Sequence, residues 1–248
     1  MLRLALVSTP RSGNTWLRYL LARTFDLEQY AVHSPSALDW SSLPQRCIVQ
    51  LHWNNTPEFR SLLNAADFRV ITISRHPLDT LLSILHFSPN EPETAQWLLG
   101  QGGSEQSIHH KSPASSEFQD YCISPRAQAL LSVTPQWWDV DGVVKVRYED
   151  LVSDTTGVLC TIAEVIGEPA SGLAEIVDSL SIENLRLTSS NQHFWKGQPG
   201  LWRNLILPDF AEEIYQVNQG SFEKPGYTCA SDEKLQVCNV EEFWAQLD

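Results

Sequence analysis

Short apolar runs alternate along this chain with longer segments that have the spacing of amphipathic helices. Strands are predicted at residues 2–8, 47–51, 69–74 and 143–147, because each is a short run of buried-type side chains next to turn-forming residues. Helices are predicted at residues 16–24, 57–65, 77–86, 117–138, 155–166, 173–180 and 208–219. This alternation favours an α/β fold, a single domain over residues 1–248 with a central parallel sheet flanked by helices.

Local signals set several boundaries of these elements. Thr56 before Pro57 is typical of a helix N-cap with proline at the first helical position, and Gly220 is expected to end the helix that starts at residue 208. Residues 88–116 are rich in Ser, Gly, Pro, Glu and Gln, which leaves open a mobile lid over a site or a surface loop without function. Residues 184–204 are expected to be irregular, and the tail from about residue 228 to be loosely attached.

Charge and composition narrow the possible partners. The formal net charge of −13 argues against nucleic acid and anionic membranes as partners, so any anionic ligand must be bound by a few local cations. The five cysteines are odd in number and include no Cys-x-x-Cys pair, which favours a reducing cytoplasm over a disulfide-bonded exterior. No apolar run has the length of a signal-peptide core or a membrane span, so a cytoplasmic protein is expected.

A polar loop at residues 8–16 follows the first predicted strand and leads into a helix. Backbone N–H groups of such a turn, together with the helix N-terminus, can form a cradle for an anion. Its side chains are of types that favour phosphate binding: Arg11, Ser12, Gly13, Asn14 and Thr15. The loop lacks the Gly-Lys-Ser/Thr ending of nucleoside triphosphatases. Taken alone, the loop is either a phosphate cradle or a polar turn with an ordinary helix cap.

The sequence Pro-Arg-Ser-Gly-Asn-Thr-Trp resembles the 5′-phosphosulfate-binding loop of sulfotransferases, which follows the first strand of their P-loop-like fold. The resemblance implies that residues 11–15 hold the 5′-phosphosulfate of 3′-phosphoadenosine 5′-phosphosulfate (PAPS), and that Trp16 stacks near the adenine. Many members have Lys at the position of Arg11. Arginine offers a two-pronged donor instead of a point charge, so the phosphate contact should be kept.

Two later segments are similar to the 3′-phosphate and adenine sites of the same family. Arg75 at the end of a strand and Ser83 eight residues later resemble the pair that binds the 3′-phosphate. Tyr148, in the run Tyr-Glu-Asp-Leu, is placed near the adenine by the resemblance, whereas Glu149 and Asp150 are expected to be structural. Without the resemblance, Arg75 would be interpreted as a surface ion pair and Ser83 as a solvated helix position.

Residues 194–204 resemble the loop that closes over the 3′-phosphate in sulfotransferases. Lys196 and Gly197 match that loop, while Trp195 stands where animal members often have Arg, and Arg203 is a candidate replacement for that charge. The same alignment places Ser181 and Ile182 beside the adenosine.

His52, at the end of the second predicted strand, matches the His of a Lys-Thr-His segment in cytosolic sulfotransferases. The resemblance implies that His52 is the general base and that Gln50 removes one charge near the transferring group. An ordinary histidine pKa near 6.5 would make the rate fall at acid pH. The alternative for His52 is a buried structural histidine, in which case His109 or His110 would be the next candidates.

Together these segments imply transfer of a sulfuryl group from PAPS to an acceptor hydroxyl, with catalysis by His52 and Arg11 and no metal. The acceptor is expected to be a small molecule, carbohydrate or lipid alcohol, bound by residues 30–40, residues 88–116 and residues near Trp137. Two alternatives stay open: a small-molecule kinase, disfavoured by the missing Lys-Ser/Thr, and a nucleotide-binding homologue without catalysis, kept open by Gln50 and Trp195.

Overall fold

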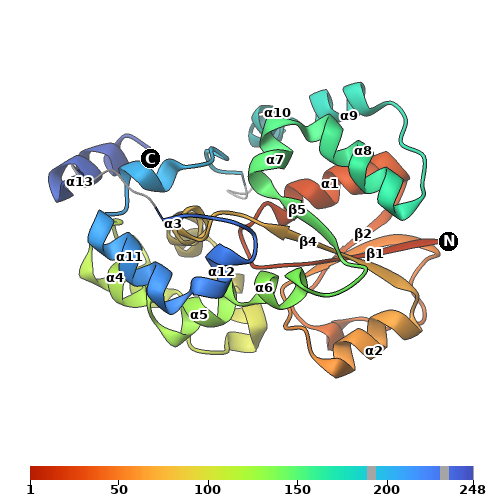
Figure 1. Ribbon diagram of the computed structural model, residues 1–248, viewed down its shortest axis with the longest axis horizontal. Helices are drawn as coiled ribbons and strands as arrows, with labels where there is room; N and C mark the ends of the chain where they lie inside the picture. Colours follow the sequence, from red (N-terminus) through yellow and green to blue (C-terminus); the bar gives the residue numbers. More distant parts are fainter. Residues whose placement is uncertain (189–193, 230–234, 248) are drawn as a thin grey trace.

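The computed structural model describes residues 1–188, 194–229 and 235–247, and a parallel sheet lies at its centre (Figure 1). Its five strands are β1 (Leu2–Val7), β2 (Glu28–Ala31), β3 (Arg46–Leu51), β4 (Phe68–Ser74) and β5 (Val144–Arg147). They pair in the order β2-β3-β1-β4-β5, and every pair is parallel. The predicted α/β fold with a central parallel sheet is therefore confirmed.

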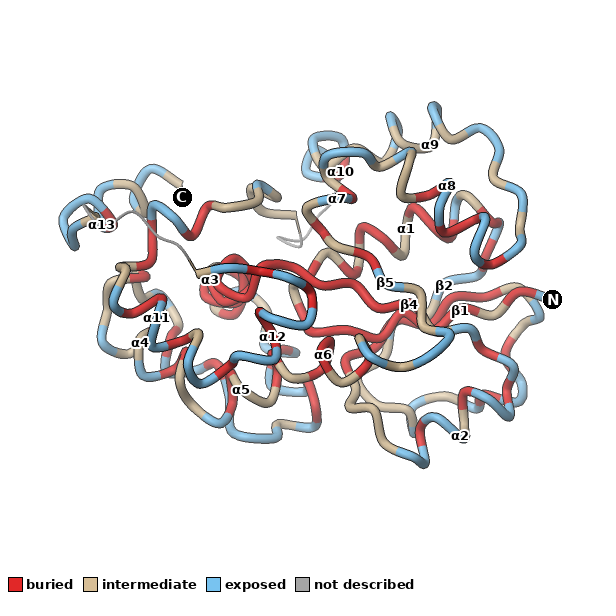
Figure 2. Tube along the Cα trace, in the orientation of Figure 1, coloured by how far each residue is buried: buried red, intermediate tan, exposed pale blue. Residues whose placement is uncertain are grey.

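Helices cover both faces of the sheet, and the alternation of side chains along β1 explains why (Figure 2). Leu4 and Leu6 face one apolar layer, while Ala5 and Val7 face the other, and all four are fully buried. The first layer is covered by α1 (Asn14–Phe25), α7 (Tyr148–Ser153), α8 (Thr155–Ile166), α9 (Leu173–Ser179) and α10 (Ile182–Thr188). The second is covered by α2 (Pro57–Ala65), α3 (Pro77–Phe87), α4 (Ser116–Cys122), α5 (Pro125–Leu131), α6 (Val133–Trp138), α11 (Pro208–Val217), α12 (Gln219–Glu223) and α13 (Val237–Ala245).

Several predicted boundaries agree with the structure. The Thr56 hydroxyl accepts a hydrogen bond from the Phe59 N–H at 3.2 Å, and Pro57 occupies the first turn of α2. Helix α8 ends at Gly167, whose φ of 68° lies in the left-handed region that favours glycine. Helix α3 begins at Pro77, directly after β4, as the alternation of strand and helix predicts.

Other predictions were wrong for local reasons. Strand β2 was missed, because an edge strand with the sequence Glu-Gln-Tyr-Ala has no apolar run. The predicted helix at residues 117–138 is three helices, since Ser124 caps a new helix that starts at Pro125. Gly220 does not end α11, which stops at Val217 where the backbone of Asn218 leaves the helical region, and Gly220 lies inside α12. Helix α10 occupies part of the stretch expected to be irregular.

Residues 88–116 are fastened to the domain instead of projecting from it. They form three short 3₁₀ helices, Ser88–Asn90, Pro92–Gly100 and Gln106–Ile108, and the side chains of Trp97 and Ile108 are buried in the core. The buried guanidinium of Arg126 donates to the Glu105 carboxylate at 2.6 Å. It also donates to three main-chain carbonyls of this segment, those of Thr94, Trp97 and Gln101, at 2.9–3.0 Å.

The tail beyond residue 228 contains helix α13. Its Val240 is buried in the second layer, and Trp244 meets the ring of Trp195 at 5.6 Å between centroids. No helix within the described ranges is long and apolar enough to cross a membrane.

The buried pair of Arg126 and Glu105 gives a test of how residues 88–116 are held. Arg126→Met should lower the free energy of unfolding by about 3–5 kcal/mol, because a carboxylate and three carbonyls would lose their buried partner. The control is Lys111→Met. Lys111 pairs with Glu117 at 2.6 Å, but the two side chains are 40% and 44% exposed, so this substitution should change the stability little. Urea unfolding measures both, and equal losses would contradict this role of Arg126.

Candidate active site

A cavity of about 220 Å³ opens where the strands of the sheet end at their carboxyl termini. The cavity brings together most of the predicted site residues: Arg11, Gly13, Asn14, Thr15, Trp16, His52, Arg75, Ser83, Tyr148 and Gly197. Ser12 and Lys196 do not line it. Ser12 is buried beside Ser74 and Thr134, under the loop. In parallel sheets this edge is where ligands bind, because the strand-to-helix loops converge there.

The loop after β1 is braced by its own polar side chains. Asn14 begins α1 and is buried, its amide donates to the Thr9 carbonyl at 2.9 Å, and the Ser8 hydroxyl donates to its Oδ1 atom. Gly13 has a φ of 95°, which favours glycine, and a Cβ atom there would lie 2.5 Å from the Tyr148 ring. Arg11 also has a positive φ, of 64°. This strained backbone is held in one conformation by the residues around it.

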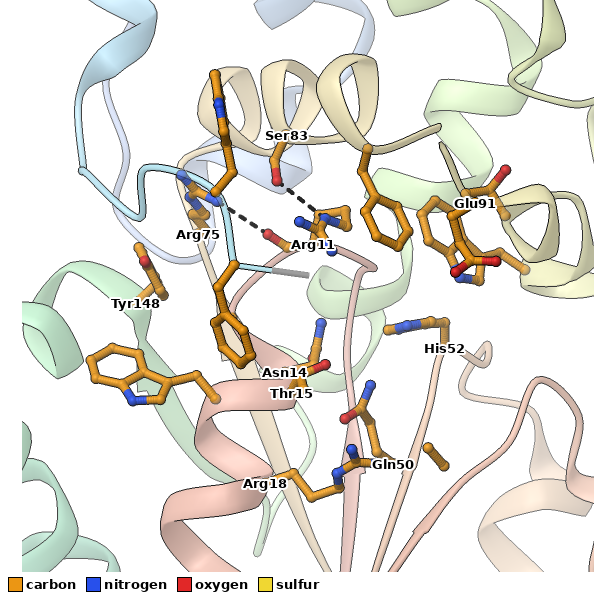
Figure 3. Close-up of a pocket in the computed structure, with 18 of the residues that line it drawn as sticks. Arg11, Asn14, Thr15, Arg18, Gln50, His52, Arg75, Ser83, Glu91 and Tyr148 are labelled. Carbon is orange, nitrogen blue, oxygen red and sulfur yellow. Dashed lines mark hydrogen bonds between the residues drawn. The ribbon is translucent and has the colours of Figure 1, made fainter. Parts of the chain in front are cut away.

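The side chain of Arg11 crosses the cavity toward α3 (Figure 3). Its Nε atom donates to the Ser83 hydroxyl at 3.1 Å, and its guanidinium carbon lies 3.9 Å from the centroid of the Phe87 ring. Burial, with a smaller contribution from the positive charge of Arg75, lowers the pKa of Arg11 to about 9. The group is still charged at neutral pH, and its charge is poorly solvated, so an anion in the cavity would stabilise it.

Arg75 reaches the same cavity from the end of β4. Its Nη1 atom donates to the Arg11 carbonyl at 3.4 Å, and its guanidinium carbon lies 4.7 Å from the centroid of the Tyr148 ring. Its Nε atom is buried and has no hydrogen-bond partner in the part of the chain that the structure describes. A buried guanidinium with an unused donor is a natural site for a phosphate oxygen.

Tyr148 and Trp16 form the end of the cavity beside Arg75. Their rings meet edge to face at 6.1 Å between centroids, and the Trp16 indole N–H donates to the Leu180 carbonyl at 2.8 Å. The Tyr148 hydroxyl donates to the Gly197 carbonyl at 2.7 Å, which ties the loop at residues 194–204 to this end. These two fixed rings suit a flat heterocycle.

Two carboxylates, the buried Asp79 and the half-buried Glu149, hold the surrounding loops. Asp79 accepts from the N–H groups of Gly200 and Trp202 at 2.6 and 2.9 Å. Glu149 accepts from the His76 N–H at 2.9 Å and from the Tyr227 hydroxyl at 2.6 Å, so its contacts are structural. Trp195 lines the cavity and stacks on His86 at 4.4 Å between centroids.

His52 presents a neutral ring to the cavity. Its Nδ1 atom lies 2.8 Å from the Ser8 carbonyl, which can only accept, so Nδ1 carries the proton and Nε2 is left as the basic atom. Burial lowers the pKa of His52 to about 4, with a partly opposing contribution from the Ser8 hydrogen bond. The ring also meets Trp97 edge to face at 5.9 Å. His52 is therefore a weak but uncharged base throughout the neutral pH range.

The remaining wall of the cavity comes from two of the three segments expected to bind an acceptor. Residues 30–40 contribute Ala31, Val32 and His33, and residues 88–116 contribute Glu91, Glu93, Thr94 and Trp97. Trp137 is instead buried in the core, where its indole N–H donates to the Trp53 carbonyl. His109 and His110 do not line the cavity. Within the described ranges, no group of three or more His, Cys, Asp or Glu side chains is arranged to hold a metal ion.

Arg18 lines the cavity as well and was missed in the sequence. Its spacing was an available signal, because it follows Asn14 by four positions and Thr15 by three, and residues at these spacings share one face of a helix. Phe194, the first residue of the matched segment at residues 194–204, also lines the cavity, and so does Phe87, to which no motif pointed.

The close approach of Gly13 and Tyr148 gives a second test. Gly13→Ala should destabilise the fold by about 1–3 kcal/mol more than Gly142→Ala, because both glycines have a positive φ but only Gly13 would clash with a ring. Gly142 is matched in backbone, with a φ of 77° and no atom within 4 Å of an added Cβ. Urea unfolding gives both values. Equal losses, or an unchanged penalty for Gly13→Ala in a Tyr148→Ala background, would exclude the clash.

Comparisons with known proteins agree with this geometry. Cytosolic sulfotransferase 12 of Arabidopsis thaliana is 22% identical over 280 residues, which cover 91% of this chain and 79% of that protein. Flavonol 3-sulfotransferase of Flaveria bidentis is 21% identical and covers 84% of this chain and 78% of its own length.

Solved structures share the fold. The mouse sulfotransferase SULT7A1 complexed with PAP has a TM-score of 0.64 at 20% identity, covering 87% of this chain and 82% of its own. Retinol dehydratase in complex with androsterone and inactive cofactor PAP has a TM-score of 0.59 at 14% identity, and the match covers 96% of this chain and 83% of that chain. The expected P-loop-like sulfotransferase architecture is thus confirmed. A family model described as "Sulfotransferase domain" matches residues 3–236, so this chain belongs to the sulfotransferase domain family.

Proposed function

We propose that this sulfotransferase takes its sulfuryl group from PAPS and transfers it to an acceptor hydroxyl, with His52 as the general base. The observation that carries this proposal is one cavity that contains the guanidinium groups of Arg11 and Arg75 together with the neutral imidazole of His52. Two solved structures with this fold are complexes with PAP, which supports PAPS as the donor here.

The residues present fit the donor. Arg75, whose Nε atom lacks a partner in the described part of the chain, and Ser83 would hold the 3′-phosphate. The loop at residues 11–15, with Ser12 contributing from beneath, would hold the 5′-phosphosulfate at the N-terminus of α1. The adenine would lie beside the Trp16 and Tyr148 rings, and Lys196 and Gly197 belong to the loop that would close over the 3′-phosphate.

In the proposed step, the Nε2 atom of His52 accepts the proton of the acceptor hydroxyl as its oxygen attacks sulfur. The new oxygen–sulfur bond forms while the bond between sulfur and the 5′-phosphate oxygen breaks, and adenosine 3′,5′-bisphosphate leaves. Arg11 and the N–H groups of its loop stabilise the negative charge that develops on the departing phosphate. The Ser8 carbonyl keeps the imidazole in the required tautomer and stabilises its protonated form. This scheme uses no metal.

The acceptor is proposed to be a small molecule with a hydroxyl group. The names of relatives include a flavonol sulfotransferase and a retinol dehydratase in complex with androsterone. The flavonols and androsterone in these names are small molecules. The wall formed by Val32, Phe87 and Trp97 offers apolar surface for such a molecule beside His52. The cytosolic names of plant relatives support a cytoplasmic location, and the net charge of −13 disfavours nucleic acid as a substrate.

The choice of nucleotide tests the donor assignment. Adenosine 3′,5′-bisphosphate at a hundredfold excess over its dissociation constant should add about 2.7 kcal/mol of stability, because it binds only the folded protein. For a chain of this size the melting temperature should rise by about 5–10 °C. ATP, which has no 3′-phosphate for Arg75, should give little shift in the same thermal scan. Equal shifts from the two nucleotides would contradict the 3′-phosphate site.

His52→Ala separates an enzyme from a nucleotide-binding homologue without catalysis. Turnover with PAPS and a reactive phenol should fall by about 10²–10⁴-fold, while the affinity for the bisphosphate stays within about threefold. His109→Ala is the control, because that side chain lies outside the cavity, and its turnover should be unchanged. Loss of nucleotide affinity together with a lower melting temperature would instead make His52 a structural histidine.

The pH profile gives an independent check on the base. The pKa of folded His52 lies below its ordinary value because burial disfavours the charged ring, so the basic form persists down to about pH 4. The value of kcat/KM should therefore stay level from about pH 8 to 5.5 and fall only near pH 4, which corrects the decline near 6.5 expected for an ordinary histidine. The rate is measured only at pH values where the protein remains folded. A fall in kcat/KM with a midpoint near pH 6.5 would contradict the buried environment of His52.

A further inference from the structure

Arg18 is a cation of the cavity that the roles assigned above do not use. It lies on α1 one turn after Asn14 and Thr15, and all three residues line the same cavity (Figure 3). Its guanidinium therefore reaches the space just beyond the loop that would hold the 5′-phosphosulfate.

The environment of Arg18 favours the binding of an anion. Its Nε atom is buried and makes no hydrogen bond to any residue that the structure describes, and its guanidinium carbon lies 5.2 Å from the centroid of the Tyr19 ring. It forms no ion pair within the described ranges. Burial lowers the pKa of Arg18, and the neighbouring Tyr19 side chain partly offsets this shift, so the charge is poorly solvated although Tyr19 lies beside it. Such a charge is stabilised when a ligand supplies the missing acceptor atoms.

Gln50 lies on the same side of the cavity in Figure 3, and α1 packs against its strand β3. The Oε1 atom of Gln50 is also buried without a partner among the described residues. Gln50 precedes His52 by two positions, so both side chains belong to one face at the end of β3. The base therefore has an uncharged neighbour on its own strand, and Arg18 supplies positive charge from the neighbouring helix.

The other two arginines lie toward the far side. Arg11 contacts Ser83 and Phe87 of α3, and Arg75 contacts Tyr148. At the acceptor end, Glu91 and Glu93 line the cavity and would repel an acidic acceptor. An anion bound by Arg18 would thus lie on the side of the cavity that carries Gln50, two positions before His52.

We propose that Arg18 binds the sulfuryl group of PAPS, by donating hydrogen bonds to its non-bridging oxygens. This inference rests on the proposed donor. During transfer, Arg18 keeps its proton and offsets the charge on the sulfuryl oxygens, while the sulfur–oxygen bond to the phosphate breaks and the bond to the acceptor oxygen forms. Arg18 thereby positions the sulfur for attack by the hydroxyl that His52 deprotonates.

Binding of PAPS and of adenosine 3′,5′-bisphosphate tests this contact without any acceptor, because the two ligands differ only in the sulfuryl group. In calorimetric titrations, Arg18→Ala should weaken PAPS by about tenfold or more and leave the bisphosphate within about threefold. Arg23→Ala is the matched control, an exposed arginine on the same helix outside the cavity, and should change neither affinity. Equal weakening of both ligands, or no weakening of either, would overturn the proposal.

Arg18→Gln is a second variant, which keeps a polar side chain at this position but removes the charge and the guanidinium group. It should reproduce the selective loss of PAPS affinity at an unchanged melting temperature, and an unchanged ratio of the two affinities would overturn the proposal. In an Arg18→Ala protein, the additional substitution Gln50→Lys should restore part of the affinity for PAPS relative to the bisphosphate, because it returns a cation to the same side of the cavity. A wild-type protein that binds neither nucleotide would instead refute the proposed donor itself.

Discussion

The cavity depends on bringing guanidinium groups together inside a strongly acidic chain. Arg11 and Arg75 line one cavity in a protein of net charge −13, and the positive charge of Arg75 contributes to the lowered pKa of Arg11. Two poorly solvated cations repel each other, so the empty arrangement costs free energy that an anion can offset. The fold supplies that free energy through the buried layers on both faces of the sheet. A ligand with two separated anionic groups matches this arrangement better than a singly charged one.

Much of the structure around the cavity serves to keep these groups in place. Asp79 fixes the loop at residues 194–204 through two backbone N–H groups, and Tyr148 reaches the Gly197 carbonyl of the same loop. Arg126 fastens the segment that carries Trp97. The Ser8 carbonyl selects the tautomer of His52. These hydrogen bonds hold the walls of a cavity in which the Nε atoms of Arg18 and Arg75 have no acceptor among the described residues.

The sequence was informative where a side chain follows directly from a strand end. Arg75 and His52 were singled out by the resemblance to sulfotransferases. Both follow strand ends, and parallel strands end at one edge of the sheet, so the fold brings the two side chains to one cavity. Arg18 was not found, because its importance depends on which face of α1 meets the cavity. Strand β2 was missed since its polar residues carry no apolar signal, and its position comes only from pairing with β3. The pKa of His52 was also beyond local patterns, because burial by distant segments sets it.

The wall of residues 88–116 illustrates the same limit. Its composition predicted a loop, yet Glu105 forms a buried pair with Arg126, which lies 21 positions away in the sequence. A charged pair between two polar segments leaves no periodic pattern, so tertiary packing alone decides that Trp97 faces the cavity. The acceptor site is therefore the part of the cavity least accessible from sequence.

The most direct measurement is a crystal structure of the protein with bound adenosine 3′,5′-bisphosphate. The expected electron density has the 3′-phosphate within hydrogen-bond distance of Arg75 and Ser83, and the 5′-phosphate against the N–H groups of residues 11–15. The adenine should lie beside Trp16 and Tyr148, which leaves the space between the 5′-phosphate and His52 open for the sulfuryl group. A nucleotide bound with its two phosphates exchanged, or bound outside this cavity, would contradict the assignment of the site.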